Sequence, residues 1–343
     1  MKRETRYLGV DLHRNCFTVY TRREDGSGSP RTWRSTELAA FARTLRPTDA
    51  VAVEATGNVR WFCAALQACG ARLVVVNPHQ FEVITRSVKK TDAHDAALLA
   101  EFLAKGILPE VRMKDEVAAR IASLAQTRDK LVKLRTVLKN KVNNLLAARG
   151  ILLRKESLAS EKGLAAVLQA PVSELEHLEL EVLVGEIRHL NASIAKVEAL
   201  LRTQGPHLPG WTNLTSITGI GTVGASILLS TIGNIADFPS EGKLAAYFGI
   251  VPRVHNSNAT EWSGHITKRG AKLGRTALVQ CALIAARYSP YLQAFYRRLA
   301  ATRGTGKAII ALARKFLGII YKTLRHNWIF TDFPRFVLAN GRG

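Results

Sequence analysis

Two apolar runs that each end in a carboxylate constrain the N-terminal third of the chain. Tyr7 to Val10 leads into Asp11, and Ala50 to Val53 leads into Glu54. Short apolar runs bounded by polar residues are typical of buried strands. Because a carboxylate at a strand end is displayed at the edge of a sheet, the pattern predicts acidic side chains along one edge.

A second pair of acids, Asp92 and Asp95, precedes an apolar-periodic segment that we expect to be helical. Three residues apart, they share one helix face. With Asp11 and Glu54 they form a set that can hold divalent metal ions against a phosphate. Structural roles are the alternative. Asp92 can be the N-cap of the helix, and Asp95 can be stabilised in the first turn by the helix dipole. Asp11 and Glu54 can be solvated surface groups at the ends of their strands.

The first hundred residues alternate strand and helix signals. Strands are expected at residues 6–11, 16–21, 31–35, 50–54 and 73–77, and helices from residue 36, at 58–69 and at 91–105. Three adjacent strands followed by crossover units predict a mixed α/β sheet with helices on its faces.

The middle of the chain has helical periodicity. Apolar residues recur at steps of three or four between residues 124 and 145, and again between 178 and 201. Two such helices, joined through Gly150 and Gly163, predict an antiparallel coiled-coil hairpin. The apolar stripe fits dimerisation and burial within one subunit equally well.

The C-terminal quarter is strongly basic. The chain carries a formal charge of +22, and residues 253–343 contain sixteen Lys or Arg against two acids. A charge of this size predicts a polyanion partner, although a merely soluble basic surface is the alternative. The basic residues that we expect to contact nucleic-acid phosphates are Lys268, Arg269, Lys272, Arg275, Arg297, Arg298, Arg314 and Lys315.

Other features narrow the class of protein. The four cysteines form no C-x-x-C pair and predict neither a zinc site nor a disulfide framework. The N-terminus lacks an apolar signal segment, and no apolar run approaches the roughly 20 residues that span a bilayer. We therefore expect a cytoplasmic, nucleoid-associated protein with no membrane contact.

A glycine turn lies between two expected helices at Ile217 to Gly221. Such a turn can present backbone N–H groups to a phosphate, or it can simply allow two helices to pack closely. Further along, residues 254–268 are polar and predict a loop before the basic turn at Arg269.

Taken together, these motifs resemble the IS110-type transposases, in particular the IS1111 branch. The matching segments cover nearly the whole chain in family order: Gly9-Val10-Asp11, Glu54-Ala55-Thr56-Gly57, Asn77-Pro78, Lys90 to Ala96, Ile217 to Gly221, Phe248 to Arg253, Ser257, Ile266 to Gly270, and Leu273-Gly274-Arg275. The acidic quartet with its Glu-Ala-Thr-Gly is quite specific, whereas the glycine turn alone is not.

The resemblance implies a RuvC-like, RNase H-like domain at residues 1–112, a helical coiled-coil hairpin at 113–204 and a C-terminal transposase domain at 205–343. It implies a Mg²⁺ site made by Asp11, Glu54, Asp92 and Asp95. It also implies target and donor DNA as substrates, an element-encoded guide RNA, and a homo-oligomer (dimer or tetramer).

The resemblance further implies a serine nucleophile a few residues beyond Pro252. Ser257 occupies that place, but Asn258 stands where the family usually has glycine. Ser263, which is followed by Gly264, is the rival. Both serines also fit ordinary hydrogen-bonding roles in a polar loop.

These observations predict an RNA-guided recombinase that cuts and rejoins DNA through serine attack. Three alternatives are a RuvC-like endonuclease that uses water, a non-catalytic nucleic-acid-binding protein, and an oligomerisation scaffold built on the helical hairpin. The nuclease would not need Ser257, and the scaffold would tolerate changes at every carboxylate. The acidic quartet argues against the non-catalytic protein.

Overall fold

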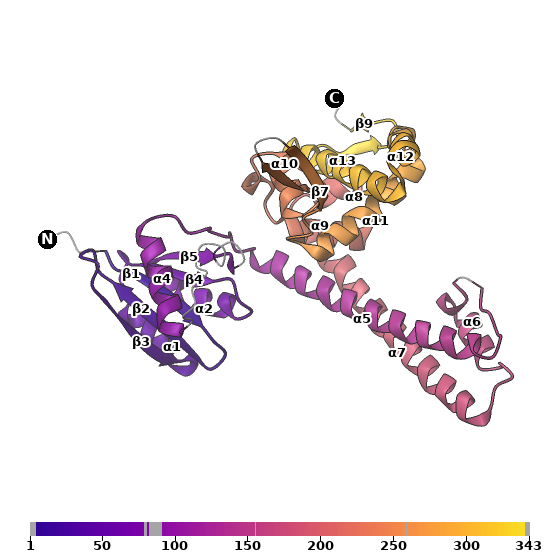
Figure 1. Ribbon diagram of the computed structural model, residues 1–343, viewed down its shortest axis with the longest axis horizontal. Coiled ribbons are helices and arrows are strands. Elements are labelled where there is room, and N and C mark those ends of the chain that lie inside the picture. The colour runs from indigo at the N-terminus through magenta and orange to yellow at the C-terminus, as the bar shows by residue number, and fades with distance from the viewer. Residues whose placement is uncertain (1–4, 79–80, 82–90, 155, 258–259, 340–343) are drawn as a thin grey trace. The chain divides into compact units, whose positions relative to one another are not determined.

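The computed structural model describes residues 5–78, 81, 91–154, 156–257 and 260–339, and between 254 and 263 it describes the backbone only. The chain divides into two units, Met1–Met113 and Lys114–Gly343 (Figure 1).

The N-terminal unit is built on a five-stranded mixed sheet. Its strand order is β3-β2-β1-β4-β5. β1 pairs antiparallel with β2 and parallel with β4. β3 extends the sheet beside β2, and β5 extends it beside β4. The bounds are β1 Tyr7–Leu12, β2 Cys16–Arg22, β3 Gly28–Arg34, β4 Ala50–Glu54 and β5 Arg72–Val76. The predicted mixed α/β sheet is therefore confirmed.

Helices cover both faces of this sheet. Alternate residues of β1 and β4, such as Val10 and Val53, join one apolar cluster with α1 (Leu38–Thr44) and α2 (Val59–Leu66). Phe17 lies at its centre, with ring centroids 5.3 Å from Phe41 and 5.4 Å from Phe62. The other face packs against α4 (Asp92–Ala104) through Ala52, Val74 and Leu99. Short 3-10 turns, Ser35–Glu37 and Gln67–Cys69, flank the first two helices.

Gly9 sets the distance between β1 and α4. A Cβ atom at this position would lie 2.0 Å from the carbonyl oxygen of Ala96 and 2.5 Å from the backbone nitrogen of Ala100. Real Cβ atoms are not found this close to backbone atoms, so only glycine permits this packing. The helix therefore lies directly on the strand that carries Asp11.

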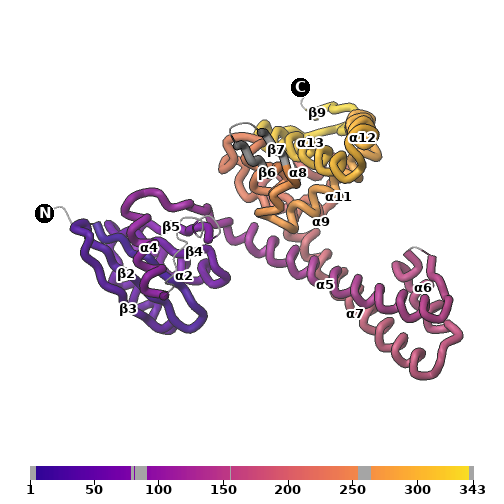
Figure 2. The backbone as a smooth tube through the Cα atoms, viewed as in Figure 1, coloured from indigo at the N-terminus to yellow at the C-terminus, as the bar shows by residue number. Residues whose placement is uncertain are grey.

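Two long helices dominate the first part of the second unit. α5 (Glu116–Ala147) and α7 (Glu174–Gln204) pack along one another (Figures 1 and 2). The connection contains the 3-10 turn Ser157–Ala159 and α6 (Glu161–Val167). Asp115 caps α5, and Ser173 with Glu176 forms a capping box at the start of α7.

The apolar stripes of these helices are divided between interior and surface. Val142 and Ile187 are buried in a shared cluster. Leu134, Leu178 and Val182 are exposed. Burial within one subunit therefore accounts for part of the predicted stripe, and the rest stays available to another molecule.

The remainder of the second unit is mainly helical. Its core joins Leu228, Phe248, Leu278 and Phe316 with residues at the base of α5 and α7. The elements are the 3-10 turn Gly205–His207, α8 Trp211–Thr215, α9 Thr222–Ile232, the 3-10 turn Ile235–Asp237, α10 Glu241–Tyr247, β6 Pro252–Ser257, β7 Thr260–Ile266, α11 Lys272–Tyr288, α12 Pro290–Arg303, α13 Thr305–Arg325, β8 Phe330–Asp332 and β9 Val337–Leu338. In the described part of the chain, no helix is both long and apolar enough to cross a bilayer.

The prediction of a loop at residues 254–268, the segment that carries Ser257, is wrong, because most of this segment forms two strands. The backbones of β6 and β7 pair antiparallel, with Ser257 opposite Thr260. The reason lies in residues such as Val254, Thr260 and Trp262, which favour strands although their neighbours are polar. Ser257 therefore ends a strand, and Asn258 falls outside the described residues.

We predict that Gly9→Ala destabilises the N-terminal unit by about 1–3 kcal/mol, because the added methyl group forces α4 away from β1. Thermal denaturation followed by circular dichroism measures the effect. Gly57→Ala is the matched control, since a Cβ there meets nothing within 4 Å. Equal melting temperatures for both variants would contradict the close packing at Gly9.

Candidate metal centre and nucleic-acid surface

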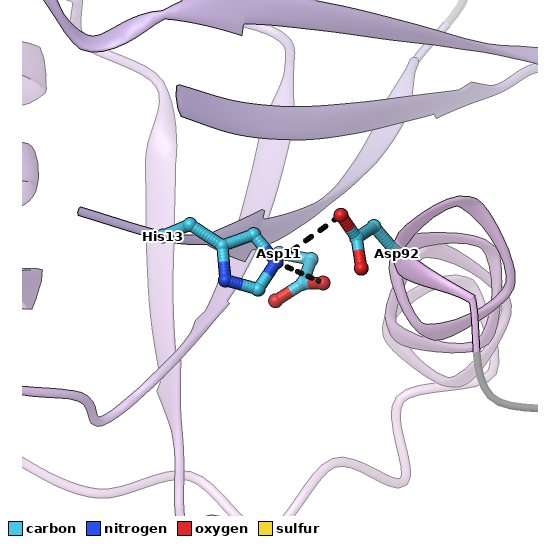
Figure 3. Close-up of side chains that lie close together, drawn as sticks. All are labelled: Asp11, His13 and Asp92. Carbon is cyan, nitrogen blue, oxygen red and sulfur yellow. Dashed lines mark ion pairs between the residues drawn. The ribbon is translucent and has the colours of Figure 1, made fainter. Parts of the chain in front are cut away.

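Three side chains, from β1, from the residue that follows it and from α4, converge at one edge of the sheet. The Nε2 atom of His13 lies 3.2 Å from Oδ2 of Asp11 and 3.3 Å from Oδ2 of Asp92. Figure 3 shows the imidazole next to both carboxylates. One potential ligand atom from each residue lies within 4.8 Å of the other two, which is close enough for all three to coordinate a single cation.

The local backbone explains why Asp11 and His13 meet. Side chains alternate across a strand, so residues on either side of the buried Leu12 point to the same face. Just beyond β1 the chain turns, and the backbone N–H of His13 donates to the carbonyl oxygen of Cys16 at 3.0 Å. The amide of Asn58 donates to the carbonyl oxygen of His13 at 2.8 Å and holds this turn.

Asp92 reaches the site from the first turn of α4. The N-cap of this helix is Thr91, whose hydroxyl accepts a hydrogen bond from the backbone N–H of His94 at 3.2 Å. The alternative in which Asp92 is the N-cap is therefore wrong. Asp92 is left with an exposed carboxylate beside His13.

Charge is crowded around Asp11. Burial raises the pKa of its carboxyl most strongly; His13 lowers it, and the nearby charges of Asp92 and Asp95 raise it. The ionised carboxylate therefore costs folding free energy at neutral pH. A bound cation would relieve both the burial cost and the mutual repulsion.

Glu54 lies on the same sheet face as Asp11 by register. Val10 is paired with Val53 in the parallel pair β1–β4, so the next residues, Asp11 and Glu54, follow side by side. Both sit opposite the face that buries Val10, on the side covered by α4. Glu54 and Asp95 are not members of the closest set of ligand atoms, but Asp95 is near enough to affect the pKa of Asp11.

Sequence reasoning missed His13. The available signal was its position two residues after Asp11 at a strand end, because that spacing places both side chains on one face. A lone histidine followed by polar residues offers no metal-ligand spacing of its own, so the pattern was not distinctive.

The predicted basic residues lie in two groups. The first surrounds the start of α11, where Lys268, Arg269 and Lys272 are exposed. Arg275 differs, because its Nη1 donates to the carbonyl oxygen of Phe248 at 2.9 Å. Arg275 therefore links α11 to the end of α10, a structural role that the sequence did not predict.

The second basic group lies on α12 and α13. Arg297, Arg298 and Arg314 are exposed. Lys315 is half-buried, and its Nζ lies 4.5 Å from the ring centroids of both Tyr291 and Phe295. Aromatic rings thus lie directly beside the cation in this group.

The two glycines of the predicted turn serve different purposes. Gly219 has φ +107°, and a Cβ there would lie 2.6 Å from the backbone nitrogen of Ala285. Gly221 has open space around it and precedes α9, where no side chain caps the helix. Close packing therefore explains Gly219, while the N–H groups at the start of α9 keep the phosphate-binding alternative open.

The roles of Ser257 and Ser263 stay predictions. Both residues belong to the β6–β7 hairpin, but their side chains lie outside the described part of the structure.

The family model described as "Transposase IS116/IS110/IS902 family" matches residues 212–297, and an IS110-type DEDD transposase model matches residues 31–149. The second match includes Glu54, Asp92 and Asp95 of the candidate site.

Full-length relatives agree with these matches. A probable family 20 transposase of Pseudomonas aeruginosa is 28% identical, over 92% of this chain and 96% of the relative. The transposase for insertion sequence element IS1111A of Coxiella burnetii is 26% identical, over 94% and 90%. A pilin gene-inverting protein of Moraxella bovis is 28% identical, over 94% and 96%. The chain is therefore similar to transposases of the IS116/IS110/IS902 family, through two separate segments and, at 26–28% identity, over most of its length.

Proposed function

We propose that this protein is the transposase of an insertion sequence and that it cuts and rejoins DNA with its carboxylate site. The convergence of Asp11, His13 and Asp92 carries the proposal, because a phosphoryl-transfer site needs cation-binding groups at one accessible place. Relatives named as transposases and as a pilin gene-inverting protein support cutting followed by rejoining.

The N-terminal unit fits an RNase H-like, RuvC-like domain. Three antiparallel strands are followed by two parallel ones, and α4 covers the face that carries the acidic residues. We propose that this unit is the DEDD catalytic domain and that the hairpin and C-terminal domain meet near residue 204.

The donor set fits a hard divalent cation. Asp11 and Asp92 offer carboxylate oxygens, which Mg²⁺ prefers, and Glu54 and Asp95 flank them. When bound, Mg²⁺ would stabilise charge on the phosphate and on the attacking and leaving oxygens. The carboxylates would hold the cation in place. The imidazole of His13 contacts both Asp11 and Asp92.

We propose Ser257 as the nucleophile. Its Oγ forms a bond to phosphorus and loses its proton to solvent, while the bond from phosphorus to one DNA oxygen breaks and that oxygen takes up a proton. The resulting phosphoserine conserves the bond energy of the phosphodiester. A DNA hydroxyl can then attack the phosphoserine, which rejoins the strand and releases the serine.

Partners follow from the family and the charge. We propose that target and donor DNA are selected by base pairing to an element-encoded guide RNA, with the basic C-terminal region holding phosphates. We also propose a homo-oligomer, because Leu134 on α5 and Leu178 and Val182 on α7 are large apolar side chains that one chain leaves exposed. A nuclease that uses water at the same carboxylates is the main competing function.

Asp92→Asn should weaken divalent metal binding by at least about tenfold, because it removes one of the three converging ligands. Isothermal titration with Mg²⁺ and electron paramagnetic resonance with Mn²⁺ measure the affinity. The same variant should lose strand exchange while keeping RNA binding. Glu101→Gln on the same helix is the control, since Glu101 pairs with Lys105 away from the site. Normal metal binding by Asp92→Asn would exclude this site.

Ser257 should become joined to DNA in the presence of Mg²⁺ and the cognate RNA. Suicide DNA substrates trap the intermediate, and mass spectrometry identifies the modified residue. An adduct on Ser263 would correct the residue and keep the mechanism. If Ser257→Ala and Ser263→Ala both recombine fully and the wild type forms no adduct, the water-using nuclease is favoured.

Binding of RNA and DNA should weaken steeply as salt rises, because each neutralised phosphate releases counterions. Lys272→Gln should lower the slope of log affinity against log salt by about one, with an unchanged melting temperature. Arg275→Gln should also lower the melting temperature, because it removes the bond to Phe248. A flat salt dependence for the wild type would argue against the phosphate-binding surface.

A further inference from the structure

A group of aromatic rings and cations on α12, α13 and the β8–β9 turn is not explained by the carboxylate site. It consists of Tyr291, Phe295, Arg298, Lys315 and Phe336, called the aromatic patch below. Tyr291, Phe295 and Arg298 are spaced i, i+4 and i+7 on α12, so they share one helix face.

Cations in this patch lie against the rings. Nζ of Lys315 is 4.5 Å from the centroids of Tyr291 and Phe295, and the guanidinium of Arg298 is 5.8 Å from Phe295. Phe336 meets Tyr291 edge to face, with centroids 5.6 Å apart and planes at 86°. The patch therefore presents aromatic surface and positive charge within one small area.

Two of these rings are held at the surface. Tyr291 is 51% exposed and Phe336 is 38% exposed. Phe336 also has φ +58°, a left-handed conformation that bulky residues rarely adopt and that costs free energy. Contact with the buried Phe333, 5.4 Å away between ring centroids, holds Phe336 in this position. Strain that is kept to display an apolar ring is typical of a binding surface.

The surrounding charge identifies the partner. Residues 272–325, which span α11 to α13, contain eleven Lys or Arg and no acidic residue. Near Phe336 the acidic residue is Asp332, and it pairs with Arg335 at 3.7 Å. Such a surface repels basic proteins and attracts a polyanion.

We propose that the aromatic patch binds an unpaired nucleotide, with the base stacked on the exposed face of one of the two perpendicular rings, Tyr291 or Phe336, and its edge against the other. Lys315 and Arg298 hold the adjoining phosphate. One nucleotide can contact both groups, because the sugar joins the base to its phosphate. A duplex cannot bind in this way, since the faces of its bases are already covered by their neighbours. Stacking is also tolerant of sequence, because every base has an aromatic face.

This proposal rests on the proposed function only in the class of ligand, which is nucleic acid. It requires neither the carboxylate site nor Ser257. Binding can therefore be measured with the full chain in EDTA, where failure of recombination has no influence on the result.

The test uses fluorescence anisotropy with a labelled single-stranded oligothymidylate, the matching oligouridylate, an abasic strand of the same length and a duplex. Tyr291→Leu and Phe336→Leu should each weaken binding of both base-bearing strands by about tenfold and leave the abasic strand and the duplex unaffected. Lys315→Gln should lower the salt slope by about one, whereas the two aromatic variants should leave it unchanged. A loss confined to one sugar type would assign the patch to RNA or to DNA.

Tyr288→Leu is the matched control. Tyr288 is 59% exposed, and among the residues that the structure describes it stacks on no ring and has no cation above it. Thermal melting confirms that each variant is folded. Cross-linking of a 5-bromouracil strand should map to Tyr291 or Phe336. Wild-type affinity in both aromatic variants, or an equal loss with the abasic strand or in Tyr288→Leu, would overturn the proposal.

Discussion

The contact between α4 and β1 at Gly9 is the constraint on which the candidate centre depends. Asp11 and Asp92 are far apart in sequence, and each belongs to a different element. They meet because the helix lies so close to the strand that a Cβ at Gly9 would overlap Ala96 and Ala100. With any larger residue the helix would move outward, and the two carboxylates would separate. A residue without a side chain thus decides the geometry of the charged ones.

The close approach of these carboxylates costs free energy when no cation is bound. Burial raises the pKa of Asp11, and the charges of Asp92 and Asp95 add repulsion. The imidazole of His13 offsets part of the cost by lying within 3.3 Å of both carboxylates of the pair. A site that is strained by like charge favours any ligand that brings positive charge, so a divalent cation would gain affinity from the repulsion that it removes.

The sequence predicted the N-terminal unit well because its strands are apolar runs with sharp ends and α4 starts at a recognisable cap. The sequence did not predict the roles of single polar side chains whose neighbours carry no distinctive pattern. His13 stands alone after a strand, and Thr91 competes with Asp92 for the same capping role. Periodicity revealed that Leu178 and Ile187 belong to a helix, but it could not say that the first is exposed and the second buried. The polar residues around Ser257 predicted a loop, whereas the strand propensity of neighbours such as Val254 and Trp262 agrees with the observed hairpin.

The C-terminal unit shows that glycine and arginine motifs can serve packing as well as chemistry. Gly249 and Gly270 both have positive φ, and a Cβ on either would lie about 2 Å from a backbone oxygen of the other segment, at 2.2 Å from Arg269 and 2.1 Å from Tyr247. Arg275 adds a hydrogen bond to Phe248 across the same junction. The two segments that flank the β6–β7 hairpin are therefore fastened together at its base, which fixes the point from which the strand ending in Ser257 extends.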